Sequence, residues 1–346
     1  MTHPDKLRLA LIGCGAIARY HLDGINECAP RIQVTAVVDP DMARAENYAS
    51  ETGAIPFASL ATALESDTFD AVDIMVPHHL HEELTLMAFA AGKHVLLEKP
   101  MAPTLAGSIR LLEAAQQARQ QFPGLVFMVA ENAQYWPEIV LAQRLIADGA
   151  IGEIITARAA FAMELDPYFF KADEDPWRYA VSKTGGGIAI DGGSHWIRPL
   201  RMWLGEIEAV IGTLGHPLAQ MEGESLVRSL IRFQSGKVAS FDALMVESPL
   251  GPEPWWRITG TKGEIIIDSG FQGGLRLVDA TDRAGRLVAE PQGYGKSFGP
   301  ELEDFSRVVL DGAAPAAGPE YSLGELRTVL ALYRSVQTDR WEAVWD

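Results

Sequence analysis

Short apolar runs alternate with amphipathic stretches over the first 130 residues of the chain. The apolar runs are rich in β-branched residues and predict strands, whereas the stretches between them have a helical period. This alternation is typical of βαβ units, and therefore of a doubly wound parallel sheet with helices on both faces. The expected strands are residues 7–12, 34–38, 71–76, 94–97 and 126–130, and the expected helices are 17–28, 41–52, 80–91 and 106–121.

The pattern changes after Trp136-Pro137. A helix is expected at 138–148, with Gly149 as its C-cap, and two-residue alternation then predicts strands separated by glycine-rich turns. We expect an α+β domain with a large, mostly antiparallel open sheet, on which a helix at 194–204 packs. The expected strands are 154–161, 210–214, 226–233, 238–246, 255–259 and 264–267, followed by a helical segment at 301–338.

A length of 346 residues suits two domains. We place the first domain at residues 1–132 and the second domain at residues 133–346. The C-terminal helix is expected to pack back on the first domain. The overall fold class is therefore α/β, with the Rossmann sheet first and the α+β domain second.

Composition and charge narrow the function classes. The chain is 48% hydrophobic and carries a formal net charge of −17, which argues against nucleic acid as a partner. No apolar run is long enough to span a membrane, so no membrane partner is expected. The two cysteines suit neither a disulfide framework nor a zinc ribbon, and this favours a cytoplasmic location.

A glycine motif follows the first expected strand and opens the first helix. Gly13 suits a tight turn, Gly15 lets the backbone approach a pyrophosphate, and Ala18 in the third position allows close packing of helix on sheet. The helix N-terminus then offers N–H groups to the phosphates. The motif predicts a dinucleotide site whose loop contacts come from Gly13, Gly15, Ala16 and Ile17.

Asp39 ends the second expected strand, 24 residues after Gly15. A carboxylate at this position accepts hydrogen bonds from the adenosine ribose and repels a 2′-phosphate. The following Pro40-Asp41 supplies no cation to offset that repulsion. NAD is therefore the expected cofactor, with NADP less favoured.

The run from Gly92 to Pro100, which ends in Glu98-Lys99-Pro100, resembles the signature of the Gfo/Idh/MocA family of oxidoreductases. Further features agree with the resemblance, which covers nearly the whole chain: the glycine motif, Pro77 with His81 four residues later, residues 151–154, and the glycines 185–187 that lead to Asp191 and His195. It implies a dinucleotide-binding Rossmann domain at residues 1–132 and a domain for substrate binding and oligomerisation at 133–346, with pairing through the open sheet in homodimers or homotetramers. It also implies a cis Lys99-Pro100 bond and cofactor contacts from Pro77, His78, His81, Glu98 and Lys99.

Three residues suit the oxidation of a secondary alcohol, which must lose a hydride from carbon and a proton from oxygen. The His195 imidazole can take the proton, and Asp191, four residues earlier, would share a helix face with it and orient the ring. Lys99 follows a strand end and can stabilise alkoxide charge on the substrate oxygen. Pro199 should kink that helix or delay its start.

Other polar residues are assigned by type and by resemblance. Trp177 and Arg178 are expected to line the substrate site together with Lys99, Asp191 and His195. Three histidines at positions 78, 79 and 81 are too close in sequence to place metal ligands well, so no metal is expected. Gln134 stands where relatives tend to have Arg, and Ile197-Arg198 where they often have Asp, and these departures leave the substrate open.

The function expected from the sequence is an NAD(P)-dependent dehydrogenase or reductase acting on a sugar, a cyclitol or a related polyol. Two alternatives stay open. One is an NAD-dependent glycosidase that oxidises its sugar transiently and releases an aglycone without net NADH. The other is a non-catalytic regulator that binds dinucleotide, which would not need Lys99, Asp191 and His195 together.

Overall fold

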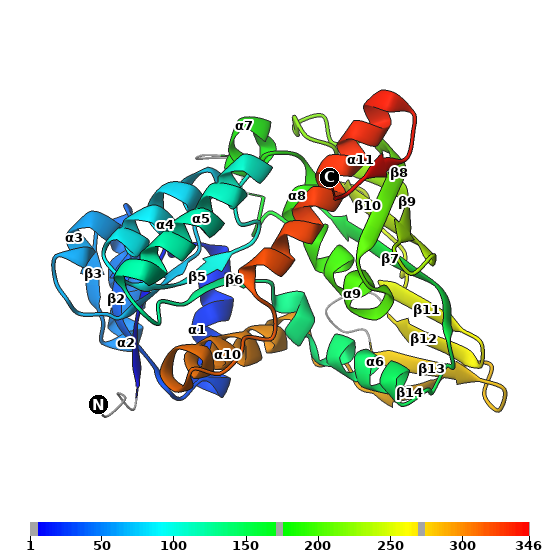
Figure 1. Cartoon of the computed structure of the whole chain (residues 1–346), viewed down its shortest axis with the longest axis horizontal. Coiled ribbons are helices and arrows are strands. Elements are labelled where there is room, and N and C mark those ends of the chain that lie inside the picture. Colours follow the sequence, from blue (N-terminus) through cyan, green and yellow to red (C-terminus); the bar gives the residue numbers. More distant parts are fainter. Residues whose placement is uncertain (1–5, 171–175, 269–273, 346) are drawn as a thin grey trace. The chain divides into compact units, whose positions relative to one another are not determined.

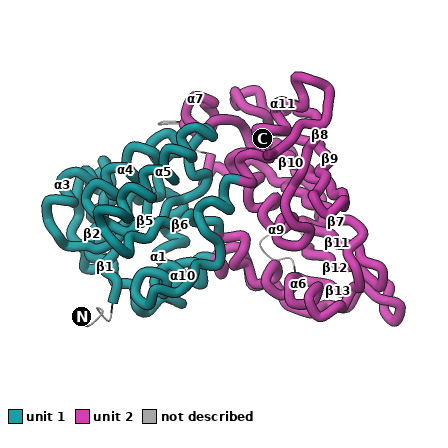
Figure 2. Tube along the Cα trace, in the orientation of Figure 1, with its two compact units in different colours: residues 1–131, 298–323 teal, residues 132–297, 324–346 magenta. Residues whose placement is uncertain are grey.

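The computed structural model describes residues 6–170, 176–268 and 274–345. The chain forms two compact units, shown in different colours in Figure 2. The first unit comprises residues 1–131 and 298–323, and the second comprises 132–297 and 324–346. A segment far along the sequence therefore completes the first unit.

The first unit contains a parallel sheet with strand order β3-β2-β1-β4-β5-β6 (Figure 1). This is the doubly wound Rossmann order, in which the chain reverses direction across the sheet between β1 and β4. The predicted parallel sheet is confirmed. Its strands are β1 (Leu7–Ile12), β2 (Ile32–Val38), β3 (Ile55–Phe57), β4 (Ala71–Ile74), β5 (His94–Glu98) and β6 (Phe127–Ala130).

Helices cover both faces of this sheet. In Figure 1, α4 and α5 lie on one face, and α1 and α10 lie on the other. The α1 and α10 helices pack closely, and a Cβ atom added at Gly24 would lie 2.7 Å from the backbone nitrogen of Gly299. The helices of this unit are α1 (Ala16–Cys28), α2 (Met42–Thr52), α3 (Leu60–Leu64), α4 (His81–Ala90), α5 (Leu105–Gln121) and α10 (Phe298–Asp311).

Two parts of the first unit differ from the expectations. Strand β3 was not predicted, because it is only three residues long and contains Pro56, which weakens a strand pattern. The single helical segment expected at 301–338 is wrong, since it consists of α10 and α11 (Leu323–Thr338) separated by a turn. Of these two helices, α10 belongs to the first unit and nearly all of α11 to the second.

The second unit contains a nine-stranded sheet within its described residues, in the order β14-β13-β12-β11-β7-β10-β9-β8-β15. It is mostly antiparallel, as predicted, but β7 and β10 pair in parallel. Strands β13, β14 and β15 were not predicted. The strands are β7 (Ile154–Glu164), β8 (Ile207–Gly215), β9 (Leu226–Phe233), β10 (Val238–Val246), β11 (Trp256–Gly260), β12 (Gly263–Ile267), β13 (Leu275–Asp279), β14 (Arg286–Ala289) and β15 (Glu342–Ala343).

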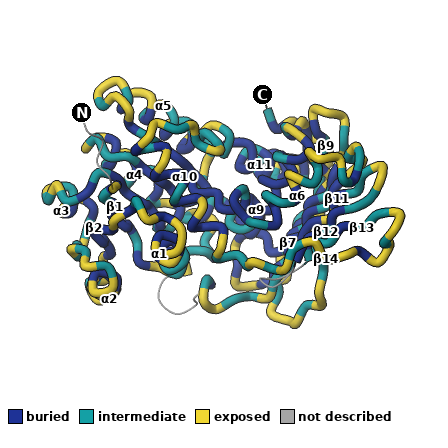
Figure 3. Tube along the Cα trace, turned by 90° about the horizontal axis from the view of Figure 1, so that it is seen from below, coloured by how far each residue is buried: buried dark blue, intermediate teal, exposed yellow. Residues whose placement is uncertain are grey.

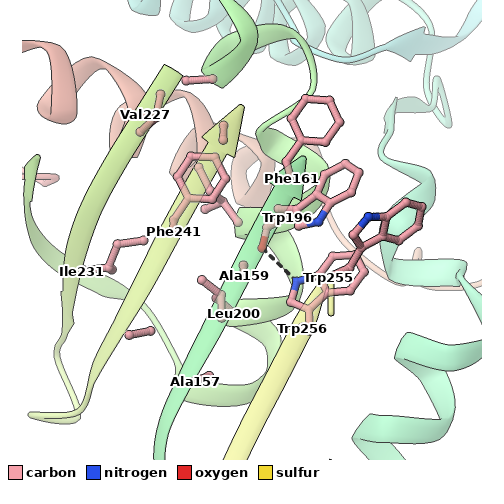
Figure 4. Packing of buried hydrophobic residues seen from close by; sticks show 14 of the residues in the cluster. Ala157, Ala159, Phe161, Trp196, Leu200, Val227, Ile231, Phe241, Trp255 and Trp256 are labelled. Atoms are coloured by element: carbon pink, nitrogen blue, oxygen red, sulfur yellow. Dashed lines mark hydrogen bonds between the residues drawn. The ribbon is translucent and has the colours of Figure 1, made fainter. Parts of the chain in front are cut away.

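The core of the second unit lies between one face of this sheet and its helices, which are α6 (Pro137–Ala147), α7 (Val181–Thr184), α8 (Ile188–Asp191), α9 (Ser194–Leu204) and α11. Figure 4 shows aromatic side chains from α9 and β11 packed together. The Trp196 and Trp256 rings stack with centroids 5.3 Å apart, and Nε1 of Trp256 donates a hydrogen bond to the Trp196 carbonyl at 3.3 Å. This packing holds α9 on the sheet.

Burial follows the layers of each unit. In Figure 3 the strands are mostly buried, whereas outer turns such as those around α2 are exposed. No helix in the described part of the chain combines the length and apolar character needed to cross a membrane.

Candidate active site

The turn between β1 and α1 has the geometry of a dinucleotide loop. Gly13 has a φ of +93°, and a Cβ atom there would lie 2.5 Å from the Met75 carbonyl oxygen, so only glycine fits. A Cβ atom at Gly15 would meet nothing within 4 Å, which leaves open space above the helix. No side chain caps α1 and no acidic residue lies in its first turn. These features suit a pyrophosphate at the helix N-terminus.

Asp39 follows β2 and fixes this turn. Its Oδ2 accepts a hydrogen bond from the Cys14 N–H at 2.8 Å, and its Oδ1 accepts one from the Asp41 N–H at 2.9 Å. A carboxylate has about four acceptor positions, so both oxygens can still accept ribose hydroxyls. The same negative charge is unfavourable for a 2′-phosphate.

Cys14 lies inside this turn. Burial and the Asp39 charge raise the pKa of its thiol to about 12. The thiol is therefore protonated near neutral pH and is a poor nucleophile. Cys14 fills space beside Asp39 rather than acting as a reactive group.

His81 connects the ends of two neighbouring strands. It begins α4, and its ring nitrogens lie 2.8 Å from the Pro100 carbonyl and 2.9 Å from the Val76 carbonyl. Burial, together with the His78 charge, lowers the pKa of His81 to about 4. The neutral ring donates to one carbonyl at a time and ties the loop after β4 to the loop after β5.

Pro77, His78 and His81 lie together just after β4, where the 3-10 helix η1 (His78–Leu80) leads into α4. His78 is buried, and its ring centroid lies 5.5 Å from that of His81. Within residues 6–170, 176–268 and 274–345, no group of three His, Cys, Asp or Glu side chains could hold a metal ion.

Lys99 follows the carboxyl end of β5, and the Lys99-Pro100 bond is cis. The lysine is half-buried. Its backbone N–H donates to Oε2 of Glu98 at 3.1 Å. Glu98 is itself buried, and its other oxygen lies 3.0 Å from Nε2 of His21. These contacts tie Glu98 to the protein interior.

The second unit brings Trp177, Arg178 and Asp191 together. Trp177 and Arg178 lie in the 3-10 helix η3 (Trp177–Tyr179), and Nε of Arg178 donates to Oδ2 of Asp191 at 3.0 Å. The Arg178 guanidinium also lies 4.2 Å from the centre of the Trp177 ring. Asp191 thus has a cationic neighbour that the sequence did not reveal.

Asp191 and His195 do not lie on one helix. Asp191 ends α8, whereas His195 is the second residue of α9, and two glycines separate the helices. The prediction that they share a helix face is therefore wrong. Pro199 lies inside α9, which begins at Ser194, so of the two alternatives for this helix the late start is wrong and the kink stays a prediction. His195 is buried, beside the Trp196 and Tyr294 rings.

Glu224 anchors the glycine segment that leads to Asp191. Its carboxylate accepts hydrogen bonds from the Gly187 and Ala189 N–H groups and from the Tyr333 hydroxyl, each at 2.9 Å. A Cβ atom at Gly187 would lie 2.0 Å from the Glu224 carbonyl oxygen, so a side chain there would clash. Burial raises the pKa of Glu224, although these hydrogen bonds oppose the shift.

Three residues that support the candidate site, His21, Glu224 and Tyr333, were not predicted from the sequence. His21 could have been found, because it shares the buried face of α1 with Ala18, Leu22 and Ile25 at helical spacing, and a polar residue on such a face needs buried partners. No local pattern marks Glu224 or Tyr333, whose contacts join distant segments. Lys99 belongs to the first unit, and Asp191 and His195 belong to the second.

Both parts of the chain match known protein families. Residues 7–123 match the oxidoreductase family with an NAD-binding Rossmann fold, and residues 139–266 match the GFO/IDH/MocA C-terminal domain. The chain is 32% identical to a 1,5-anhydro-D-fructose reductase of Ensifer adhaerens, with 96% of each chain covered. It is 25% identical to a levoglucosan dehydrogenase of Pseudarthrobacter phenanthrenivorans, covering 97% of this chain and 98% of the relative.

A solved oxidoreductase from Thermotoga maritima has the same fold. It superposes with a TM-score of 0.84 at 28% identity, and 98% of each chain is covered. The likeness extends over both units and therefore includes the residues of the candidate site.

Proposed function

The chain belongs to the Gfo/Idh/MocA family of oxidoreductases, and we propose that it transfers a hydride between a nicotinamide and a secondary alcohol or ketone of a small polyol. It is an NAD(P)-dependent oxidoreductase with an NAD-binding Rossmann fold. The substrate is a sugar, a cyclitol or a related compound. Relatives named 1,5-anhydro-D-fructose reductase and levoglucosan dehydrogenase support this class.

One observation carries the proposal, which is the placement of Lys99. Its half-buried side chain follows the carboxyl end of β5, the edge at which open α/β sheets bind ligands. Glu98 accepts a hydrogen bond from the lysine backbone N–H, and His81 contacts the carbonyl of the next residue, Pro100. A lysine fixed in this way can present its ammonium to a substrate oxygen in a constant geometry.

Gly13, Gly15 and Asp39 would hold the dinucleotide, which accepts or supplies the hydride at nicotinamide C4. Lys99 donates a hydrogen bond to the substrate oxygen and stabilises negative charge that develops there. His195 exchanges the hydroxyl proton.

Asp191, Trp177 and Arg178 belong to the substrate side of this proposed site. The Asp191 carboxylate is already paired with Arg178 at 3.0 Å. We expect this paired carboxylate to orient and stabilise the His195 ring during proton exchange. Pro77, His78, His81 and Glu98 frame the cofactor side.

The location and assembly of the protein are part of the proposal. The small number of cysteines supports a cytoplasmic location. Exposed apolar residues at Leu230 and Val238, which share one face of the nine-stranded sheet, support a homodimer or homotetramer formed through that sheet. Light scattering on the wild type and on Leu230→Glu tests this assembly.

The test of the activity follows nicotinamide absorbance. The purified protein is mixed with NAD⁺ or NADP⁺ and a panel that includes levoglucosan and inositols, and with NADH and 1,5-anhydro-D-fructose for the reverse direction. We expect turnover with at least one member of the panel, faster with NAD than with NADP. Lys99→Ala should reduce kcat by about a thousandfold, the order expected for loss of a group that stabilises transition-state charge.

Lys93→Ala is the matched control, because Lys93 precedes the same strand at its opposite end and donates to the Phe69 carbonyl. Turnover within about threefold of wild type is expected for this control, as for a residue away from the chemistry. If Lys99→Ala is as active as Lys93→Ala, the proposed role of Lys99 is wrong. Release of an aglycone without net NADH would indicate glycosidase chemistry instead.

A further inference from the structure

A buried chain of polar groups runs beneath Lys99 in the first unit. His21 lies on α1 with none of its surface exposed. Its Nδ1 lies 2.8 Å from Oδ2 of Asp73 on β4, and its Nε2 lies 3.0 Å from Oε1 of Glu98 on β5. One imidazole therefore joins a helix to two neighbouring strands of the Rossmann sheet.

The contacts suit a charged ring between two carboxylates. A neutral imidazole has one N–H, so it cannot donate to both carboxylates, whereas an imidazolium donates at both nitrogens. Burial by itself lowers the pKa of His21, but Asp73 and Glu98 outweigh this effect and raise it well above the ordinary value. The positive ring then compensates charge on the two buried carboxylates.

Two more buried acidic groups belong to the same electrostatic cluster. Glu301 on α10 interacts with His21 and the carboxylates beside it, and also with Glu131 after β6. The Phe298 ring also packs against His21, with its centroid 5.1 Å from that of the imidazole. His21 is thus a basic side chain within a cluster of acidic groups.

The chain ends at the backbone of Lys99. Glu98 uses Oε1 for His21 and Oε2 for the Lys99 N–H. The direction of the Glu98 carboxylate therefore depends on His21, and the direction of the Lys99 backbone depends on Glu98.

We propose that His21 is a positioning residue for Lys99 and acts through Glu98. The imidazolium fixes the Glu98 carboxylate, which in turn fixes the Lys99 N–H and with it the start of the lysine side chain. The inference rests on the proposed function of Lys99. It adds a residue that touches neither substrate nor cofactor but sets where the lysine ammonium is presented.

The first measurement needs no substrate. Exchange of the Lys99 backbone amide is followed by hydrogen–deuterium exchange with residue resolution, in wild type and in His21→Gln. Loss of the imidazolium should accelerate this exchange about tenfold, as expected when a hydrogen bond to a charged group is weakened. Exchange at Leu96, in the middle of the same strand, reports on general loosening and should change less than twofold.

Two further variants make the result specific. Asp73→Asn keeps the side-chain shape but removes the charge that favours the imidazolium, so it should also accelerate Lys99 exchange. If His21→Gln does not fold, Asp73→Asn alone tests whether His21 positions Lys99. His94→Gln is the matched control, because His94 begins β5 and accepts the Val126 N–H at 3.0 Å. It should leave Lys99 exchange unchanged.

Kinetics complete the test, with whichever panel substrate the wild type turns over. His21→Gln should lower kcat between about tenfold and a hundredfold, the range for a misplaced catalytic group, while KM for NAD stays within twofold. Unchanged Lys99 exchange in both His21→Gln and Asp73→Asn would overturn the positioning role, whatever Lys99→Ala does. Accelerated exchange combined with full turnover of Lys99→Ala would instead show that the proposed function of Lys99 fails.

Discussion

Nη1 of Arg198 donates a hydrogen bond to Oε1 of Gln134 over 2.6 Å. Gln134 and Arg198 come from the two stretches at which we expect the sequence to depart from the family pattern, and the structure brings them into contact. Arg198 is almost fully buried and also pairs with both oxygens of Glu325, which Arg201 contacts as well. Gln134 is thus a neutral neighbour for an arginine whose charge Glu325 already balances.

Arg198→Leu should destabilise the second unit strongly, because it removes one member of a buried charge network and leaves the Gln134 amide without this contact. We expect a loss of about 3 kcal/mol, the order measured when one partner of a buried ion pair is removed. Urea denaturation at pH 7 measures it. Arg286→Ala, which removes an exposed ion pair with Asp279, should cost less than about 0.5 kcal/mol. Equal effects of the two substitutions would contradict the prediction.

Asp39→Asn should change the cofactor preference. The amide keeps one acceptor oxygen for the glycine turn but loses the charge that favours ribose hydroxyls and repels a 2′-phosphate. The ratio of Kd for NAD⁺ to Kd for NADP⁺ should rise about tenfold or more, the order for a hydrogen bond to a charged group. Isothermal titration measures both constants. Asp41→Asn, at the N-cap of α2, is the control and should leave the ratio unchanged.

The two cysteines should differ in reactivity. Cys28 is exposed, whereas Cys14 is buried and its pKa is raised to about 12, so almost no Cys14 thiolate exists at pH 8. Reaction of Cys14 with an aromatic disulfide reagent should be roughly a hundredfold slower than that of Cys28, since the thiolate is the nucleophile. Absorbance kinetics on wild type and on Cys28→Ser separate the two. A fast phase that survives in Cys28→Ser would show that Cys14 is accessible and ionised.

Much of the fold could be predicted because burial imposes a period on each element. Strands β9 and β10 and helix α9 were predicted with the bounds that they have. Strand β3 was missed because three residues with a proline show no period. Edge strands such as β14 are mostly exposed, so their apolar residues do not alternate with polar ones.

The candidate site could be predicted only where a local motif marks it. Gly13, Asp39 and Lys99 stand at strand ends, which the sequence pattern locates. The partners of Asp191 could not be predicted, because Arg178 lies 13 residues before it and Glu224 reaches its helix from the segment before β9. Such contacts depend on tertiary packing rather than on spacing along the chain.

The ionisation of Glu301 should make the stability of the first unit depend on pH. It is fully buried on α10, and neither of its oxygens has a hydrogen-bond partner among the described residues. Burial raises its pKa well above the ordinary value, and the Glu98, Glu131 and Asp73 charges add to this effect while His21 opposes it. The folded protein therefore keeps a proton on Glu301 at pH values at which the unfolded chain has lost it.

This proton on folded Glu301 determines whether stability rises or falls as the pH increases. Below a pH of about 4.5, Glu301 is protonated in both the folded and the unfolded state and has no effect on stability. Above this pH the folded state binds more protons than the unfolded state. The free energy of unfolding of the wild type then falls by up to about 1.4 kcal/mol per pH unit until the folded-state pKa is reached. Glu301→Gln removes this penalty without changing the shape, so its advantage over wild type should grow between pH 5 and pH 8. Urea denaturation at unit pH steps measures the difference, with Glu303→Gln on the same helix as control. A difference that stays constant with pH would show that Glu301 ionises normally in the folded protein.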